Sequence, residues 1–108
     1  MNNDEKNSQS LITESVGFGD QYAIFERIFS FGDKKLKIAI KSDAYDSQSY
    51  ARMYIFSPTL MQWNILNDIH YSLMATEHKL YSKKSRVTVA NFENDAKKLT
   101  DIAKQILS

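Results

Sequence analysis

The histidines are the residues of this chain best suited to acid–base chemistry or metal binding, because imidazole titrates near neutral pH. They are His70 and His78, and the sequence contains no cysteine. Neither has a companion at a spacing typical of a metal site, and we find no nucleophile elbow, Walker loop, zinc-protease motif or glycine-rich dinucleotide turn. We therefore expect no catalytic residue, metal or cofactor, and interpret both histidines as surface or boundary residues.

An acidic loop is a second candidate for chemistry. The segment 42–49, SDAYDSQS, contains Asp43 and Asp46, whose carboxylates are of the kind that binds calcium. The spacing of acids, the glycine and the closing glutamate of a calcium loop are missing. Because aspartate and serine commonly hydrogen-bond the backbone of their own loop, we expect that role here.

Cations and aromatic rings share one parity of two predicted strands, in a pattern that suits nucleic acid. If Ala51, Met53 and Ile55 face the core, the other parity of that strand joins lysines of the preceding one. Cations bind phosphates, and rings stack on bases at about 1–3 kcal/mol per base. This candidate face, for nucleic acid or for a protein partner, comprises Lys35, Lys37, Lys41, Tyr50, Arg52 and Tyr54.

The same pattern has a purely structural interpretation. A half-exposed sheet often carries lysine at its edges and tyrosine for strand propensity. The parity is also open, because Phe56 would then lie on the outer face and favours the reverse orientation.

Two further clusters are candidate contact sites. A basic loop without acids would bind phosphate, or would be solvated loop charge; it comprises Lys79, Tyr81, Lys83, Lys84 and Arg86. An apolar knob after Pro58 would bind a protein, since tryptophan and methionine are favoured at interface centres; it comprises Leu60, Met61 and Trp63. The alternative for Trp63 is a core position.

A β-hairpin over residues 22–41 is the clearest structural signal. YAIFERIFSF and KKLKIAI flank Gly32-Asp33, and glycine readily adopts the positive φ of a tight hairpin turn. With this turn, Phe29 lies opposite Leu36 on the face that must be core. Arg27 falls on the same face, where we expect it near an edge with its head in solvent.

The other predicted strands are less uniform. Residues 50–56, YARMYIF, predict a strand. Residues 58–70 fit a helix, because Met61, Ile65 and Ile69 recur every four positions. A strand over 63–71 is the alternative, because the apolar residues there share one parity: Trp63, Ile65, Ile69 and Tyr71. The strand is favoured, because asparagine and aspartate are poor helix-interior residues. Residues 86–90, RVTVA, suggest a further short strand.

An amphipathic helix over residues 91–107 completes the fold. Phe92, Ala96, Leu99 and Ala103 follow the spacing of one helix face. Its apolar face must be buried and the hairpin face must be covered. We therefore predict an α+β fold in which this helix packs on one face of an antiparallel sheet of three to five strands.

The N-terminal residues differ in composition from the rest. Residues 1–10 have no apolar side chain after the initiator methionine, so we predict a flexible tail over 1–16 and a single domain over 17–108. Leu11, Ile12 and Val16 would allow a short edge strand instead.

The composition bounds the function. The 108 residues carry a formal net charge of +1, with 43% hydrophobic and 25% charged residues, as in an ordinary soluble domain. Such a charge gives no global attraction to nucleic acid or to an anionic membrane, so electrostatic binding requires local clustering. Without a membrane span or a targeting segment, we expect a cytoplasmic protein that does not bind membranes.

The predicted layout of successive antiparallel strands followed by one helix is similar to that of Whirly-type single-strand binders. No residue motif carries this likeness, so no residue is transferred. We expect a non-enzymatic binding protein that contacts a protein partner, as a phage- or mobile-element-type inhibitor or immunity-type protein does, or that forms a homo-oligomer. Binding of single-stranded nucleic acid on the cation–aromatic face is the alternative.

Overall fold

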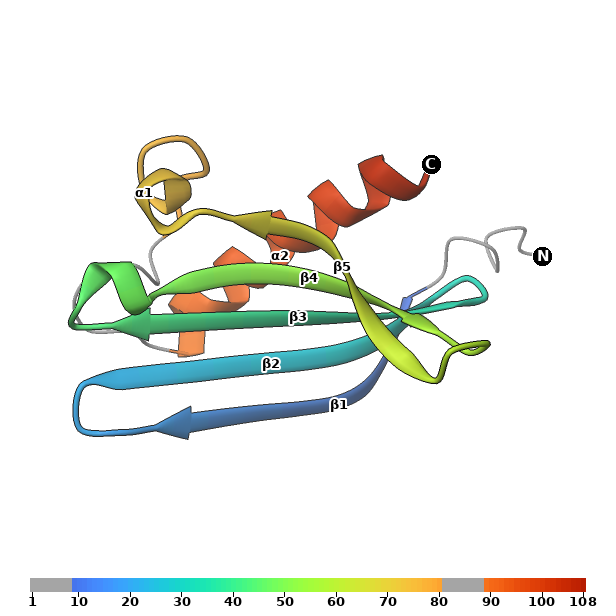
Figure 1. Ribbon diagram of the computed structural model, residues 1–108, viewed down its shortest axis with the longest axis horizontal. Coiled ribbons are helices and arrows are strands. Elements are labelled where there is room, and N and C mark those ends of the chain that lie inside the picture. The colour runs from blue at the N-terminus through green and yellow to red at the C-terminus, as the bar shows by residue number, and fades with distance from the viewer. Residues whose placement is uncertain (1–8, 81–88) are drawn as a thin grey trace.

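The computed structural model describes residues 9–80 and 89–108, where five antiparallel strands form one sheet in the order β1-β2-β3-β4-β5 (Figure 1). The strands are β1 (Gln9–Phe18), β2 (Tyr22–Phe31), β3 (Lys34–Asp43), β4 (Tyr50–Ser57) and β5 (Gln62–Ile69). The helical segments are η2 (Asp46–Gln48), α1 (Tyr71–Met74) and α2 (Val89–Leu107). The predicted α+β architecture is therefore confirmed.

The β2–β3 hairpin has the register that the sequence predicts. Phe29 pairs with Leu36, and Phe25 pairs with Ile40. Gly32 begins the turn with φ of 62°, in the left-handed region that favours glycine. The turn residue thus sets which side chains of both strands share a face.

The apolar core lies between the sheet and α2, which crosses behind β3 and β4 in the view of Figure 1. The rings of Phe25 and Phe92 stack with centroids 5.0 Å apart and planes 15° apart. Ala51 and Met53 are also buried, so the parity that the sequence leaves open is the one in which these residues of β4 face α2. The largest fully buried apolar side chains are Phe25, Phe29, Phe92, Leu36, Ile38, Ile40, Met53, Met74 and Leu99.

Arg27 lies on the second strand from the β1 edge, at the margin of the core, and lines a pocket there. Its guanidinium pairs with Glu14 of β1 at 3.1 Å and with Glu93 of α2, and its side chain is only 16% exposed. Two carboxylates at the margin of the core offset the cost of placing this charge on an apolar face. Arg27 thereby connects β2 to both β1 and α2.

Strand β1 includes residues 9–16, which the sequence analysis assigns to the tail; residues 1–8 lie outside the described residues. Pairing with β2 extends to Gln9, with a bulge between Leu11 and Thr13. The backbone of β2 offers a row of hydrogen-bonding groups at its edge, and pairing with that row orders a segment that buries little side-chain surface. The edge strand considered as the alternative is the arrangement found.

Strand β5 exists as predicted but ends at Ile69. His70 follows β5 and is the N-cap of α1: its side chain accepts a hydrogen bond from the backbone N–H of Ser72 in the first turn of that helix. A bulge shifts the β4–β5 register between Met53 and Tyr54. Within β5, the predicted common face is therefore wrong for Ile69 only. Trp63 and Ile65 share a face opposite Phe56 and Tyr54, and Ile65 is 58% exposed, whereas Ile69 lies opposite Ala51 and is buried.

The strand predicted over 86–90 is wrong for the two of its residues that the structure describes, Val89 and Ala90. Residues 86–88 lie outside the described residues, and Val89 and Ala90 are the first residues of α2. None of the helices within residues 9–80 and 89–108 is long and apolar enough to cross a membrane.

Replacing Phe92 with Ala should lower the free energy of unfolding by about 3–5 kcal/mol, because it removes the ring stacked on Phe25 and leaves a cavity. Urea unfolding followed by circular dichroism measures this. Ile106→Ala on the same helix is the matched control: Ile106 is 47% exposed, so its loss should change stability by no more than about 0.5 kcal/mol. Equal effects of the two variants would contradict the assignment of the core.

Candidate nucleic-acid interface

The sheet face opposite α2 carries the predicted cation–aromatic residues. Because alternate residues of β4 are buried against α2, the residues between them point to the other side of the sheet. The β3–β4 register places Lys37 beside Tyr54 and Lys41 beside Tyr50. The structure thus brings together all the predicted residues of this surface, which we call the outer face: Lys35, Lys37, Lys41, Tyr50, Arg52 and Tyr54.

Each cation of the outer face lies over an aromatic ring. Contacts of this kind contribute about 0.5–1 kcal/mol at exposed sites. The distances to the ring centroids are 4.8 Å for Lys35–Phe56, 4.8 Å for Lys37–Tyr54, 5.0 Å for Lys37–Trp63, 5.3 Å for Lys41–Tyr22 and 4.1 Å for Arg52–Tyr50.

Phe56 and Trp63 also belong to the outer face. The sequence places Phe56 there for one of the two open parities of β4, and it predicts a knob or a core position for Trp63. Their rings meet edge to face, with centroids 5.3 Å apart and planes 68° apart. The position of Phe56 follows from the parity of β4, which buries Ala51 and Met53. Trp63 could not be found from strand parity, because the bulge in the β4–β5 pairing changes which residues of β5 face outwards.

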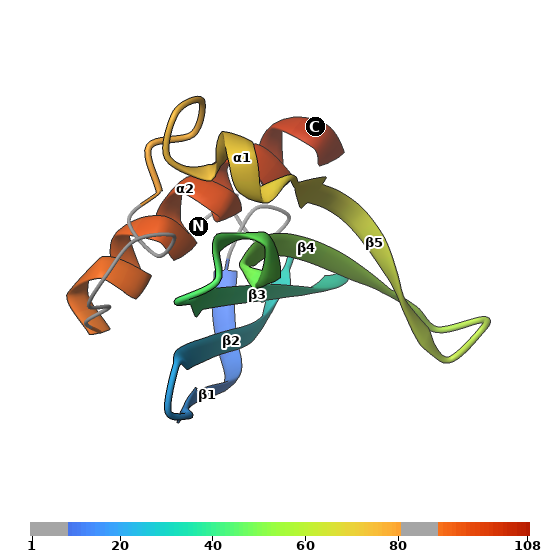
Figure 2. The same ribbon diagram turned by 60° about the vertical axis from the view of Figure 1, so that its left-hand side comes forward.

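The predicted apolar knob is therefore divided. Trp63 lies half-buried on the outer face, whereas Leu60 and Met61 lie at the tip of the β4–β5 hairpin with 62% and 75% of their surface exposed. This hairpin projects from the body of the protein (Figure 2). Leu60 and Met61 thus form a separate candidate site, which we call the hairpin tip.

Carboxylates neutralise one end of the outer face. Asp68 Oδ1 lies 3.3 Å from Arg52 Nε, and Asp43 Oδ2 lies 3.4 Å from Lys41 Nζ. Partial burial lowers the pKa of Arg52, but its interactions with Tyr54 and Asp68 outweigh this effect and the pKa is raised overall. Arg52 therefore remains a cation under all ordinary conditions.

The other end of the outer face is cationic. Within the described residues, neither Lys35 nor Lys37 forms an ion pair with a carboxylate. Three rings accompany these lysines, and the rings can stack on planar groups. We call this part of the outer face the basic half; it comprises Lys35, Lys37, Tyr54, Phe56 and Trp63.

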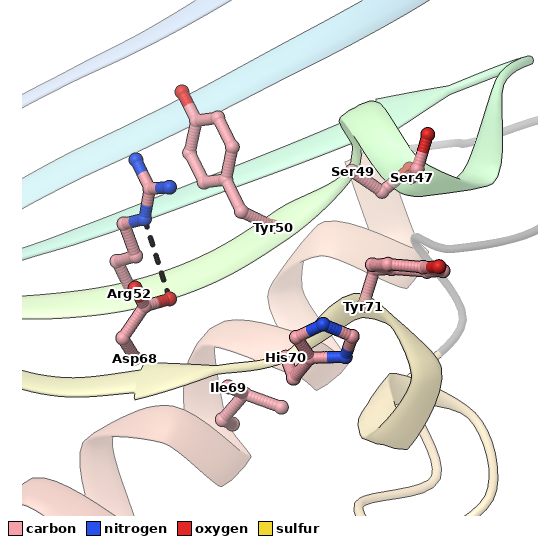
Figure 3. Close-up of a pocket in the computed structure, with 8 residues that line it drawn as sticks. All are labelled: Ser47, Ser49, Tyr50, Arg52, Asp68, Ile69, His70 and Tyr71. Carbon is pink, nitrogen blue, oxygen red and sulfur yellow. Dashed lines mark hydrogen bonds and ion pairs between the residues drawn. The ribbon is translucent and has the colours of Figure 1, made fainter.

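A pocket of about 280 Å³ lies at the neutralised end of the outer face (Figure 3). Tyr50 and Arg52 belong both to the outer face and to this pocket. Burial raises the pKa of Tyr50, and the charge of Arg52 offsets only part of that effect, so its hydroxyl stays protonated at neutral pH. The lining residues are Ser47, Ser49, Tyr50, Arg52, Asp68, Ile69, His70 and Tyr71.

The pocket combines serine, histidine and aspartate, but their hydrogen bonds do not form a catalytic chain. Asp68 binds Arg52, and His70 Nδ1 lies 2.7 Å from the hydroxyl of Ser72. Ser49 Oγ accepts a hydrogen bond from the backbone N–H of Asp43. The contact between His70 and Ser72 has the length of a nucleophile–base hydrogen bond, but the same nitrogen of His70 also accepts from the Ser72 backbone N–H at the start of α1. Asp68 binds Arg52 and not His70, so it does not orient the imidazole as the third member of a catalytic chain would.

The remaining candidates stay apart from this site. His78 is not among the residues that line the pocket, and residues 9–80 and 89–108 contain no group of three or more side chains suited to hold a metal ion. Asp43 Oδ1 accepts a hydrogen bond from the N–H of Tyr45, which confirms the loop role expected for it. Of the predicted basic loop, Lys79 is exposed; Tyr81, Lys83, Lys84 and Arg86 lie outside the described residues.

Comparison of the chain with protein-family models, with curated proteins and with solved structures finds no match to any of them. The function is therefore inferred from the geometry and chemistry of the molecule.

Proposed function

We propose that the protein binds single-stranded nucleic acid on its outer face. Lys35 and Lys37 contact phosphates, and the rings of the basic half stack on bases. The observation that carries the proposal is the position of these lysines beside three rings, with no carboxylate partner among the described residues, on a sheet face that α2 leaves uncovered.

The outer face suits a single strand better than a duplex. Bases of a duplex are stacked on one another and cannot lie on protein rings, whereas bases of a single strand can. A β-sheet presents its side chains roughly perpendicular to its surface, so neighbouring rings of β4 and β5 offer successive stacking positions.

Binding would exchange one set of contacts for a stronger one. In the free protein, the Lys37 ammonium lies over the rings of Tyr54 and Trp63. A phosphate draws the ammonium off these rings and leaves their faces to bases. Stacking contributes about 1–3 kcal/mol per base, more than the 0.5–1 kcal/mol of an exposed cation–π contact, so the exchange is favourable.

The number of cations limits the affinity. Each phosphate contact with a single strand contributes about −0.7 to the slope of log K against log salt. Two phosphates therefore give a slope of about −1.4, and three give about −2.1 if Lys41 also takes part. We expect moderate affinity that decreases as salt is added.

Trp63 is the only tryptophan of the chain, so its fluorescence reports directly on the basic half. Titration with a single-stranded oligonucleotide at low salt should quench it to saturation, and added salt should reverse the quenching. Lys37→Ala and Tyr54→Ala should each weaken binding about tenfold, through loss of a phosphate contact and of a stacking ring respectively.

Lys97→Ala is the matched control for this experiment. Lys97 is exposed on α2, on the other side of the sheet, and its loss should leave the affinity unchanged. The proposal would be wrong if no oligonucleotide bound at low salt, or if Lys97→Ala weakened binding as much as Lys37→Ala.

The hairpin tip favours a second candidate function, namely binding of a protein partner or of a second copy of this chain. Leu60 and Met61 are exposed, and Met61 has φ of 53°, a conformation that costs a non-glycine residue about 1–3 kcal/mol. A large apolar residue held there without burial is suited to insert into a partner. An inhibitor or immunity-type protein would act through such a contact; cytoplasmic location and lack of enzymatic activity stay predictions.

If the hairpin tip joins two copies, light scattering should show a mass that rises above that of the monomer with concentration. Combined Leu60→Ser and Met61→Ser substitutions should restore the monomer. Leu11→Ser with Ile12→Ser, on the exposed edge strand β1, is the matched control and should not. A monomer at every concentration that also captures no protein partner would contradict this second candidate.

A further inference from the structure

We propose that the pocket beside Tyr50 and Arg52 receives a guanine base that is turned out of the bound strand. This inference rests on the proposed function, because a strand must lie on the outer face for its base to enter the pocket. It adds a base preference to a surface whose other contacts, to phosphates and ring faces, do not distinguish one base from another.

The pocket lies on the path of a nucleic-acid strand that runs along β4. Phe56 belongs to the basic half and Tyr50 lines the pocket. The two residues lie six positions apart on β4, which is about 20 Å along an extended β-strand. Between them, Tyr54 and Arg52 continue the same row of outward-facing side chains. A nucleic-acid strand whose bases stack on the basic half therefore reaches the pocket without leaving the outer face.

The shape of the pocket suits one flat ring system. The ring of Tyr50 stands on one side of the opening, and the rings of His70 and Tyr71 stand on the other (Figure 3). His70 and Tyr71 are themselves in contact, with centroids 4.5 Å apart. The volume of about 280 Å³ lies below the range of about 300–1,000 Å³ usual for small-molecule pockets, so a single base fits better than a larger cofactor.

The polar groups of the pocket distinguish guanine from the other bases. Arg52 uses Nε to bind Asp68, and its guanidinium also interacts with the side chain of Tyr54. A guanidinium has five N–H donors, so further N–H groups of its terminal nitrogens are left for a ligand. The carboxylate of Asp68 can accept further hydrogen bonds beside them. Guanine presents acceptors at O6 and N7, which arginine binds, and adjacent N–H donors at N1 and N2, which a carboxylate binds. No other base carries two adjacent N–H donors beside a carbonyl oxygen.

Asp68 also argues against a phosphate in this pocket. Its carboxylate neutralises Arg52 at 3.3 Å and would repel an anion. The phosphates of a bound strand are therefore expected at Lys35 and Lys37, and a base at Arg52 and Asp68. These different roles make the two ends of the outer face separable by mutation.

The test compares oligothymidines that carry a single central guanine or a single central adenine, by Trp63 quenching. The guanine form should bind about tenfold more tightly. Asp68→Asn should abolish this preference without weakening the binding of plain oligothymidine, because it removes an acceptor and a negative charge. Lys37→Ala should weaken both forms and keep their ratio.

Glu26→Gln is the matched control, since Glu26 lies on the outer face opposite Ala39 and does not line the pocket. It removes the same charge as Asp68→Asn but should leave the guanine preference intact. If oligothymidine binds and guanine brings no advantage, or if Asp68→Asn keeps the advantage, the pocket inference is overturned while the proposed function stands.

Free nucleosides separate the remaining outcomes. Guanosine, but not adenosine, should shift the amide resonances of residues 47–52 and 68–71 in a heteronuclear NMR spectrum. If no oligonucleotide binds but guanosine produces these shifts, the pocket is supported as a guanine site and the proposed function falls. If guanosine produces no shift and no oligonucleotide binds, both are overturned.

Discussion

The structure depends on the fact that α2 can cover only one face of the sheet. Phe92 of α2 stacks on Phe25, and Arg27 pairs with Glu93, so the helix is held on that face by both apolar and ionic contacts. Within the described residues no second helix of comparable length covers the opposite face. That face must therefore carry side chains that tolerate water, and lysines stacked on aromatic rings meet this requirement.

The same requirement produces the candidate site. Rings favour strand formation but would be an aggregation hazard if left bare on an open sheet. The Lys37 ammonium covers the faces of Tyr54 and Trp63 in the free protein and is itself held close to where a phosphate would bind. A stabilising arrangement and a binding surface are thus one set of residues, divided by Asp68 and Asp43 into a neutralised end and a cationic end.

Much of the fold could be predicted from the sequence, because local chemistry specifies it. Gly32 sets the hairpin turn, and from that turn the alternation of side chains leads to the outer face. The bulge in the β4–β5 pairing has no local signal, so the position of Trp63 on the outer face was missed. The partners of Arg27, Glu14 and Glu93, could not be predicted because they lie on other elements. The pocket joins η2, β4, β5 and the start of α1 through tertiary contacts that no spacing in the sequence reveals.

Lysine acetylation read by mass spectrometry, with and without a saturating single-stranded oligonucleotide, tests most directly whether the uncovered sheet face is the binding surface. Lys35 and Lys37 should react in the free protein and become strongly protected in the complex, while Lys97 on α2 should react equally in both. Protection of Lys97 with unchanged reactivity of Lys37 would place the contact on the helix side and contradict this account.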